Sequence, residues 1–146
     1  MYANIQATAQ PTLIPQVPSF VPGKTQLIVR PIGAQLVHDV DLISKMSPHV
    51  ELIIGGLAYR TGVAHHQGKT PTWNDTITHP VKGTENSIEI NVWEGLKEEK
   101  GKLIGNGFVP LLEVIQKGAV TNWYDIYFDK KLAGKVNIDL KVVQTL

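Results

Sequence analysis

The chain has 146 residues, of which 42% are hydrophobic and 18% charged, a balance that is typical of one globular domain with a real core. A formal net charge of +1 creates no overall field that would attract nucleic acid, so we expect no nucleic-acid partner. The chain has no cysteine, which excludes disulfides, cysteine-ligated zinc and thiol catalysis.

The N-terminal segment, residues 1–24, differs from the rest of the chain. Prolines recur every three or four residues and Lys24 is its only charge, so the pattern predicts an extended or polyproline II arm. It can be a flexible tail, or an arm that packs on this domain or on a partner. Its apolar side chains favour a packed arm, and they are the candidate partner-binding residues: Leu13, Ile14, Val17, Phe20 and Val21.

From Thr25 onward the sequence predicts short strands separated by turns. Leu27, Val29 and Ile32 begin a strand region in which Pro31 indicates a bulge or an edge. Residues 50–54, 88–92 and 135–142 alternate in part or throughout between apolar and polar side chains, as strands with one buried face do. Gly55-Gly56 predicts a tight turn after the first of these segments.

One segment, residues 110–117, predicts a short helix instead. Pro110 stands at a helix-start position, Gly118 at a helix-stop position, and the leucines and isoleucine between them are spaced for one helical face. Many short strands with little helix indicate an all-β sandwich or barrel, which is as far as periodicity leads.

Motifs in a fixed order then resemble the C2 domain family. They are residues 45–52 (KMSPHVEL), the PTWND segment at 71–75, INVWE at 90–94, LIG at 103–105, NWY at 122–124 and AGKV at 133–136. The resemblance covers about residues 25–143 and implies an eight-stranded antiparallel C2-type β-sandwich, with the arm at 1–24 and the C2 domain at 25–146. We expect scaffold roles for these motifs: Trp73 buried in the core, Asn74 bonding nearby backbone, and Pro48 setting an extended chain.

The resemblance also implies where calcium would bind, between the first and third loops at one end of the sandwich. Calcium takes about six to eight oxygen ligands, so several carboxylates must lie close together. Asp39, Asp41 and Glu94 are the remnants of such a set. Ser47, Leu96, Gly101 and Lys102 stand where the family has acids. We therefore expect a degenerate site, no bound metal and no cofactor.

Other chemistry has little support in the sequence. The five histidines, at positions 38, 49, 65, 66 and 79, form no recognisable metal-ligand spacing, and we expect them to be exposed. There is no nucleophile elbow and no glycine-rich phosphate loop. We expect no enzymatic activity and no catalytic residues.

Two surfaces are candidates for lipid or protein contact. Arg60, Lys69 and Lys82 are candidate lipid-headgroup residues, because some C2 domains bind phosphoinositides through basic strand surfaces. Glu51 and Glu89 are expected on polar strand faces as well, which favours an ordinary solvated surface. The loop tips carry apolar side chains that suit a bilayer or, slightly better without an ion, a protein partner: Leu42, Ile43 and Leu96.

The first functional hypothesis is a non-enzymatic, calcium-independent interaction or scaffolding module, a subunit of a larger assembly whose arm packs on a partner protein. The second is a peripheral membrane adaptor that binds anionic phospholipid, and the third is a calcium-triggered lipid binder. Residues 1–10 lack the features of a secretory signal, and no run reaches the roughly 18 apolar residues that span a bilayer. We expect a cytoplasmic protein, associated with the cytoskeleton or a membrane.

Overall fold

The computed structural model describes residues 21–41, 45–95 and 101–144. Leu13, Ile14, Val17 and Phe20 of the arm, and the loop-tip residues Leu42, Ile43 and Leu96, lie outside the described residues. The elements, in chain order, are β1 (Thr25–Leu36), β2 (Pro48–Ile54), β3 (Leu57–Arg60), β4 (Ile77–Pro80), β5 (Ser87–Glu94), β6 (Lys102–Pro110), α1 (Leu112–Lys117), β7 (Ala119–Phe128) and β8 (Lys131–Gln144).

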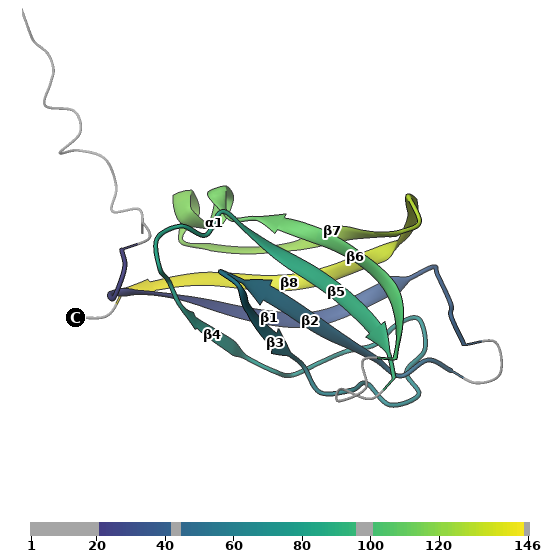
Figure 1. Ribbon diagram of the computed structural model, residues 1–146. Coiled ribbons are helices and arrows are strands. Elements are labelled where there is room, and N and C mark those ends of the chain that lie inside the picture. Colours follow the sequence, from purple (N-terminus) through teal and green to yellow (C-terminus); the bar gives the residue numbers. More distant parts are fainter. Residues whose placement is uncertain (1–20, 42–44, 96–100, 145–146) are drawn as a thin grey trace, which may run out of the picture.

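The strands form two layers that face each other (Figure 1). The strand order is β3-β2-β5-β6-β7-β8-β1-β4, and every pairing is antiparallel. Only Asn106 and Tyr127 are paired between β6 and β7, so the sheet divides there into the layers β3-β2-β5-β6 and β4-β1-β8-β7. The prediction of an eight-stranded antiparallel sandwich with one short helix is confirmed.

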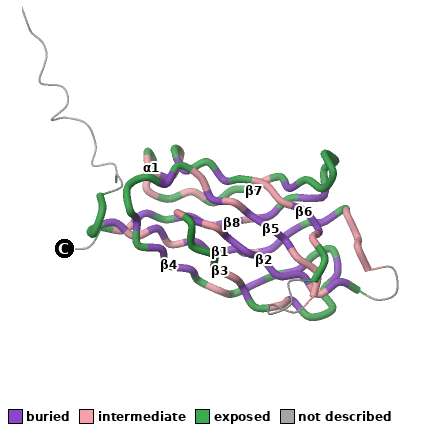
Figure 2. The backbone as a smooth tube through the Cα atoms, in the orientation of Figure 1, coloured by how far each residue is buried: buried purple, intermediate pink, exposed green. Residues whose placement is uncertain are grey.

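The core lies between the layers because the strands alternate as the sequence predicts. In β8, Val136, Ile138 and Leu140 are buried while Lys135 and Lys141 are exposed. Figure 2 shows mostly buried residues along β2 and much of β5, whereas exposed residues mark the turns and much of β7. Burial of this apolar surface, at about 25 cal/mol per Å², is the main stabilising contribution to the fold.

Pro31 lies at a β-bulge, as expected. The register between β1 and β8 shifts between Pro31 and Gly33. Beyond the bulge, the backbone of Gly33 approaches the segment before β4 so closely that a Cβ would lie 2.9 Å from the carbonyl oxygen of Pro71. Trp73 is anchored beside this contact: its backbone N–H donates to Ile32 (3.0 Å) and its indole Nε1–H donates to the carbonyl of Pro48 (3.1 Å). The predicted burial of Trp73 is confirmed.

The prediction that the Asn74 side chain bonds nearby backbone is wrong. Asn74 is exposed, and it is the neighbouring Asp75 whose carboxylate accepts the backbone N–H of Gly62 (3.2 Å).

The short helix lies where it was predicted: it follows Pro110 and ends at Gly118, whose φ of 85° favours glycine. The Gly55-Gly56 turn is also confirmed, with φ values of 56° and 83° in the β2–β3 hairpin.

Successive connections alternate between the two ends of the sandwich. We call one the loop end, which holds the connections 37–47, 61–76, 95–101 and the β7–β8 turn at Asp129-Lys130. The other is the clasp end, which holds residues 21–24, the turn at 55–56, and the connections 81–86 and 111–118. In Figure 1 the loop end is on the right and α1, at the clasp end, is on the left.

Candidate functional site

The expected calcium position lies at the loop end, where Glu94 is already bonded within the chain. Its Oε1 accepts the backbone N–H of Ser47 at 2.6 Å. The hydroxyl oxygen of Ser47 in turn accepts the backbone N–H of His66 (3.0 Å), and the Ser47 carbonyl accepts the N–H of Gly95 (3.2 Å). The serine therefore connects three segments at the place where an acidic ligand is expected.

Asp39 and Asp41 lie on the first connection of the loop end. Asp39 Oδ1 accepts the backbone N–H of Asp41 (2.9 Å), a local turn that occupies one of its oxygens. Within residues 21–41, 45–95 and 101–144, no group of three or more histidine, aspartate and glutamate side chains is placed to hold a metal. Since calcium needs about six to eight oxygens, the described residues do not fit this ion.

The three candidate headgroup residues do not form one patch. Lys69 lies on a connection at the loop end, where its carbonyl accepts the N–H of Leu36, the last residue of β1. Lys82 lies at the clasp end, next to Val81, whose N–H donates to Thr25 at the start of β1. Because β1 has 12 residues, these two positions are about 35–40 Å apart.

Arg60, the third candidate, lies on the outer face of β3 and is neutralised there. Its Nη2 forms an ion pair with Glu51, which is only 3% exposed. The same carboxylate accepts hydrogen bonds from Asn91 Nδ2 (3.3 Å) and from the indole N–H of Trp93 (3.2 Å). Glu89, on the same face, accepts a second bond from Asn91 (3.0 Å). Glu51 and Glu89 therefore lie on a polar strand face, as expected, with two carboxylates against the guanidinium of Arg60. The expectation of an ordinary solvated surface is wrong for Glu51, which is buried there together with Asn91.

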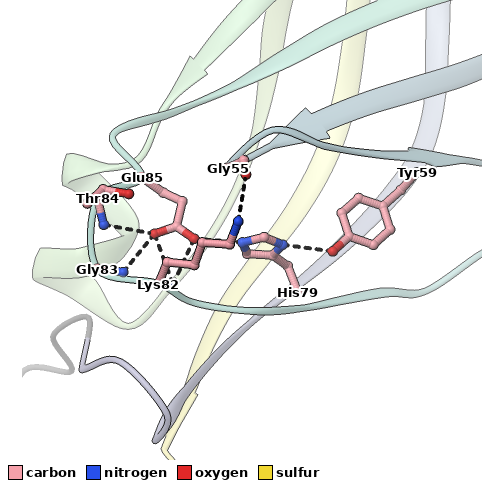
Figure 3. Close-up of polar contacts among 7 residues, drawn as sticks. All are labelled: Gly55, Tyr59, His79, Lys82, Gly83, Thr84 and Glu85. Carbon is pink, nitrogen blue, oxygen red and sulfur yellow. Dashed lines mark hydrogen bonds and ion pairs between the residues drawn. The ribbon is translucent and has the colours of Figure 1, made fainter.

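The clasp end contains a buried polar network that the sequence analysis did not predict (Figure 3). His79 of β4 lies between Glu85, whose Oε2 is 2.7 Å from its Nε2, and the Tyr59 hydroxyl, 2.8 Å from its Nδ1. An ionised carboxylate only accepts, so Nε2–H is the donor, and in the neutral ring the Tyr59 hydroxyl donates to Nδ1. Tyr59 belongs to β3, so this polar clasp joins the free edges of the two layers.

Glu85 is the charged centre of the polar clasp. It also accepts the backbone N–H groups of Lys82 (2.9 Å), Gly83 (2.9 Å) and Thr84 (3.1 Å). Burial alone would raise the pKa of Glu85, but these bonds together with His79 outweigh it and lower the pKa from 4.5 to about 2. Burial, and then the charge of Glu85, raise the pKa of Tyr59.

The side chains of His79 and Glu85 are fully buried, and their polar atoms all have hydrogen-bond partners. This indicates a structural role for both residues. The expectation that the histidines are exposed is therefore wrong for His79 and for His49, whose Nδ1–H donates to the Gly95 carbonyl (3.2 Å). It is right for His65 and His66, whereas His38 is half-buried and its Nδ1–H donates to the Ile104 carbonyl (2.7 Å). His79 and His49 belong to strands and lie on faces that the fold covers, which sequence spacing did not reveal.

A hollow at the loop end is the second feature that the sequence analysis missed. It has a volume of about 370 Å³ and lies between the β7–β8 hairpin and the residues that follow β1; its lining includes Val37, His38, Phe128 and Leu132. A second hollow of about 270 Å³ shares Val37 and Leu132. Val37 is 61% exposed and Leu132 53%, a degree of exposure that Phe108 and Leu112 share elsewhere on the domain.

Fold and site together define an antiparallel β-sandwich of the binding-module class, and comparison with known proteins gives the family. The C2 domain family model matches residues 25–126, so the chain belongs to the C2 domain family. C2 domains are mostly non-catalytic modules that bind membrane phospholipids or proteins. The described helix α1 is too short to cross a membrane.

Three relatives illustrate the relationship. The 16 kDa phloem protein 2 of Arabidopsis thaliana is 23% identical over 110 residues, 75% of each chain. A single C2 domain of plant extended synaptotagmin 1 has a TM-score of 0.73 at 18% identity and covers 86% of this chain and 98% of its own. A calcium-bound structure of two C2 domains of extended synaptotagmin 2 has a TM-score of 0.68 at 21% identity, covering 85% of this chain and 47% of its own.

Proposed function

We propose that this protein is a non-enzymatic C2 interaction module that works without calcium, as a subunit of a larger assembly. The observation that supports this most is the bond between Glu94 and the backbone of Ser47. Calcium would have to displace that bond and would find a serine hydroxyl, not a carboxylate, beside it. An adaptor that needs no ion binds its partner constitutively.

Calcium titration by isothermal calorimetry tests this proposal. We expect no heat of binding up to millimolar calcium, and no change in melting temperature. Saturable binding in the micromolar range would contradict it. Ser47→Asp serves as a matched gain-of-function control. It restores one acid at a family ligand position, so it should show a weak heat of calcium binding where the natural chain shows none.

The proline-spaced arm is the proposed attachment to a partner protein. A stiff, apolar segment loses little conformational entropy when it lies along another surface. The described root of the arm is part of the domain: the Val21 N–H donates to Thr25 Oγ1 (2.8 Å), and Pro22 lies against Gly83. Deletion should therefore stop at residue 20.

A chain without residues 1–20 should fold as the full chain does but fail to co-fractionate with its native assembly. A full-length variant with Leu13, Ile14, Val17 and Phe20 replaced by serine separates loss of apolar contact from loss of length, and it should fail in the same way. Unchanged co-fractionation of both variants would exclude the arm as the attachment.

The second candidate function is a peripheral adaptor on anionic phospholipid. It is favoured by the exposed apolar side chains Val37, Phe128 and Leu132, which have Lys130 and Lys131 beside them. Sedimentation with phosphatidylserine vesicles in the presence of a chelator tests it: binding that survives chelation and weakens with salt supports the adaptor. Binding that appears only with calcium would instead favour a calcium-triggered lipid binder.

A further inference from the structure

β7 is an edge strand of its layer, and the first half of the strand is unpaired on the side away from β8. On one side, β7 pairs with β8 from Ala119 to Phe128. On the other side, among the described residues, only Tyr127 is paired, with Asn106 of β6. No described strand therefore pairs with this side of the stretch from Ala119 to Trp123, which we name the open edge.

The hydrogen bonds to β8 determine which backbone groups of the open edge face away from the sheet. The Val142 N–H donates to the Gly118 carbonyl (2.9 Å), so these two residues form a hydrogen-bonded pair at the start of β7. Such pairs alternate along an antiparallel ladder, so the even-numbered residues of the open edge bond to β8. The odd-numbered residues therefore direct their N–H and C=O groups outward.

Two further contacts support this assignment. Asp125, which is also odd-numbered, directs its carbonyl to β6, where a Cβ on Gly107 would collide with the oxygen. The N–H of Trp123 is satisfied by the side chain of the preceding residue, because Asn122 Oδ1 accepts it at 2.8 Å. The Asn122 side chain thus takes the place of a neighbouring strand at this N–H group.

The open edge lacks the features that keep edge strands apart. It contains no proline, no lysine and no other charged residue. All its residues are exposed apart from the half-buried Val120, and exposed residues mark much of β7 in Figure 2. Trp123, which is 40% exposed, displays its indole on the outer face of the layer. An edge without such protection is available for pairing with another strand.

From this arrangement we infer that the open edges of two copies of the chain pair as antiparallel strands about a two-fold axis at Thr121. In this register Thr121 lies opposite Thr121 of the second copy, and Ala119 lies opposite its Trp123. The largest side chain is then beside the smallest, the threonines form a favourable cross-strand pair, and no like charges meet. This self-complementarity favours a second copy over an unrelated chain. The layers β4-β1-β8-β7 of the two copies become one continuous sheet.

This inference goes beyond the proposed function, because neither calcium nor the arm takes part in the pairing. It requires only that the Asn122 side chain releases the Trp123 N–H to the carbonyl of a facing strand. One hydrogen bond is exchanged for another at that group, so the exchange costs little.

Analytical ultracentrifugation of the full-length protein over a range of concentrations tests the inference. A short ladder is a small interface, so we expect a reversible dimer with a Kd of roughly 10–500 µM. Thr121→Pro removes an outward N–H and leaves the bonds to β8 in place, so it should remain monomeric over the same range. The matched control Thr121→Ala removes the same hydroxyl but keeps the N–H, and its Kd should stay within about threefold of the natural value. Thermal melting verifies that both variants are folded.

A charge at the axis provides a second test. Thr121→Lys brings two ammonium groups together across the paired strands, so it should weaken the dimer by more than about tenfold, and less at high salt. The control is Thr78→Lys, at an exposed threonine of β4, the opposite edge strand of the same layer. That variant should dimerise like the natural chain.

A crosslink can locate the axis, because the chain has no cysteine of its own. Thr121→Cys places the two new thiols opposite each other, where the Cα atoms of a directly facing pair are about 5.5 Å apart, a separation that a disulfide spans. Mild oxidation should therefore link most of the protein into dimers. Thr78→Cys, treated in the same way, should stay largely unlinked.

The remaining outcomes separate this inference from the proposed function. A natural chain that is monomeric up to about 1 mM, or that dimerises no better than Thr121→Pro, would overturn the inference. If the natural chain is monomeric and Thr121→Pro fails to co-fractionate with the native assembly, the open edge pairs with a different protein and the second copy is wrong. Calcium calorimetry and the arm variants are read independently of dimerisation, so either proposal can fail while the other stands.

Discussion

At the clasp end the side chains of His79 and Glu85 are completely buried and fully bonded, whereas at the loop end Val37 and Leu132 leave more than half of their surface in water. Both ends close the same two layers. The clasp end contains a buried and fully bonded polar network, beside the exposed leucines Leu57 and Leu112, whereas the loop end places its exposed apolar side chains around a hollow.

That difference indicates how the domain separates stability from binding. A buried charge is tolerated only where every lone pair has a donor, and the four donors around Glu85 meet this condition. The exposed apolar side chains that border the hollow at the loop end contribute little to folding, and we propose that they serve binding. We therefore expect mutations at the clasp end to change the free energy of unfolding, and mutations at the loop end to change association.

The largest effect is expected for Glu85→Ala. The substitution leaves the buried Nε2–H of His79 and the backbone N–H groups of three exposed turn residues without their acceptor, and should lower the free energy of unfolding by about 3–5 kcal/mol. Urea unfolding measures this. The control Lys117→Ala removes an exposed helical ion pair with Glu113 and should cost about 0.5 kcal/mol or less. A change below about 1 kcal/mol in Glu85→Ala would contradict the structural role of the polar clasp.

Lowering the pH should reduce the free energy of unfolding slightly less than Glu85→Ala does, through protonation of Glu85 at the clasp end. The pKa of Glu85 is about 2 in the folded protein against 4.5 ordinarily, so its stabilising contribution is complete above about pH 5 and is lost as the pH falls toward 2. The difference corresponds to roughly 3 kcal/mol. Urea unfolding of the natural chain and of Glu85→Gln between about pH 6 and pH 2 isolates this contribution. Stability curves with the same pH dependence would show that Glu85 does not cause the acid sensitivity.

At the loop end, Glu94→Ala should have a modest effect. It removes one acceptor for the Ser47 N–H at a half-buried position, which is expected to cost about 1 kcal/mol. The melting temperature should fall in the variant by the same amount with and without calcium. If calcium stabilises the natural chain but not the variant, Glu94 is a ligand and the proposed calcium independence is wrong.

The long strands and the helix could be predicted from the sequence because their signals are local. Residues 135–142 alternate strictly, and Pro110 and Gly118 bracket α1 within one short segment. The edge strands β3 and β4 could not be predicted, since four residues each are too few for a period to be recognised. Trp73 was predicted to be buried from the size of its side chain, and it is buried, with its indole N–H donating to the Pro48 carbonyl.

The functional features were harder to predict because they depend on contacts between distant segments. His79 and Glu85 are separated by five residues that carry no recognisable motif, and only the return of the chain after β4 brings them together. Phe128 and Leu132 flank a turn without glycine, asparagine or proline, so apolar residues there were not distinguished from core residues. Their exposure depends on how the hairpin extends beyond the neighbouring strands, and a periodic pattern does not encode it.

The smallest predicted effect separates the two ends most sharply. Lys130→Gly places a glycine at a turn position where φ is 67°, so it should stabilise the domain by about 0.5–1 kcal/mol. The same change removes a lysine from the tip of the β7–β8 hairpin, so under the second candidate function binding to anionic vesicles should weaken by roughly fivefold. Lys131→Gln, which removes a charge without changing the turn, should weaken binding equally while leaving stability unchanged. A variant that is more stable and also binds as well as the natural chain would mean that the strained turn serves some purpose other than presenting Lys130.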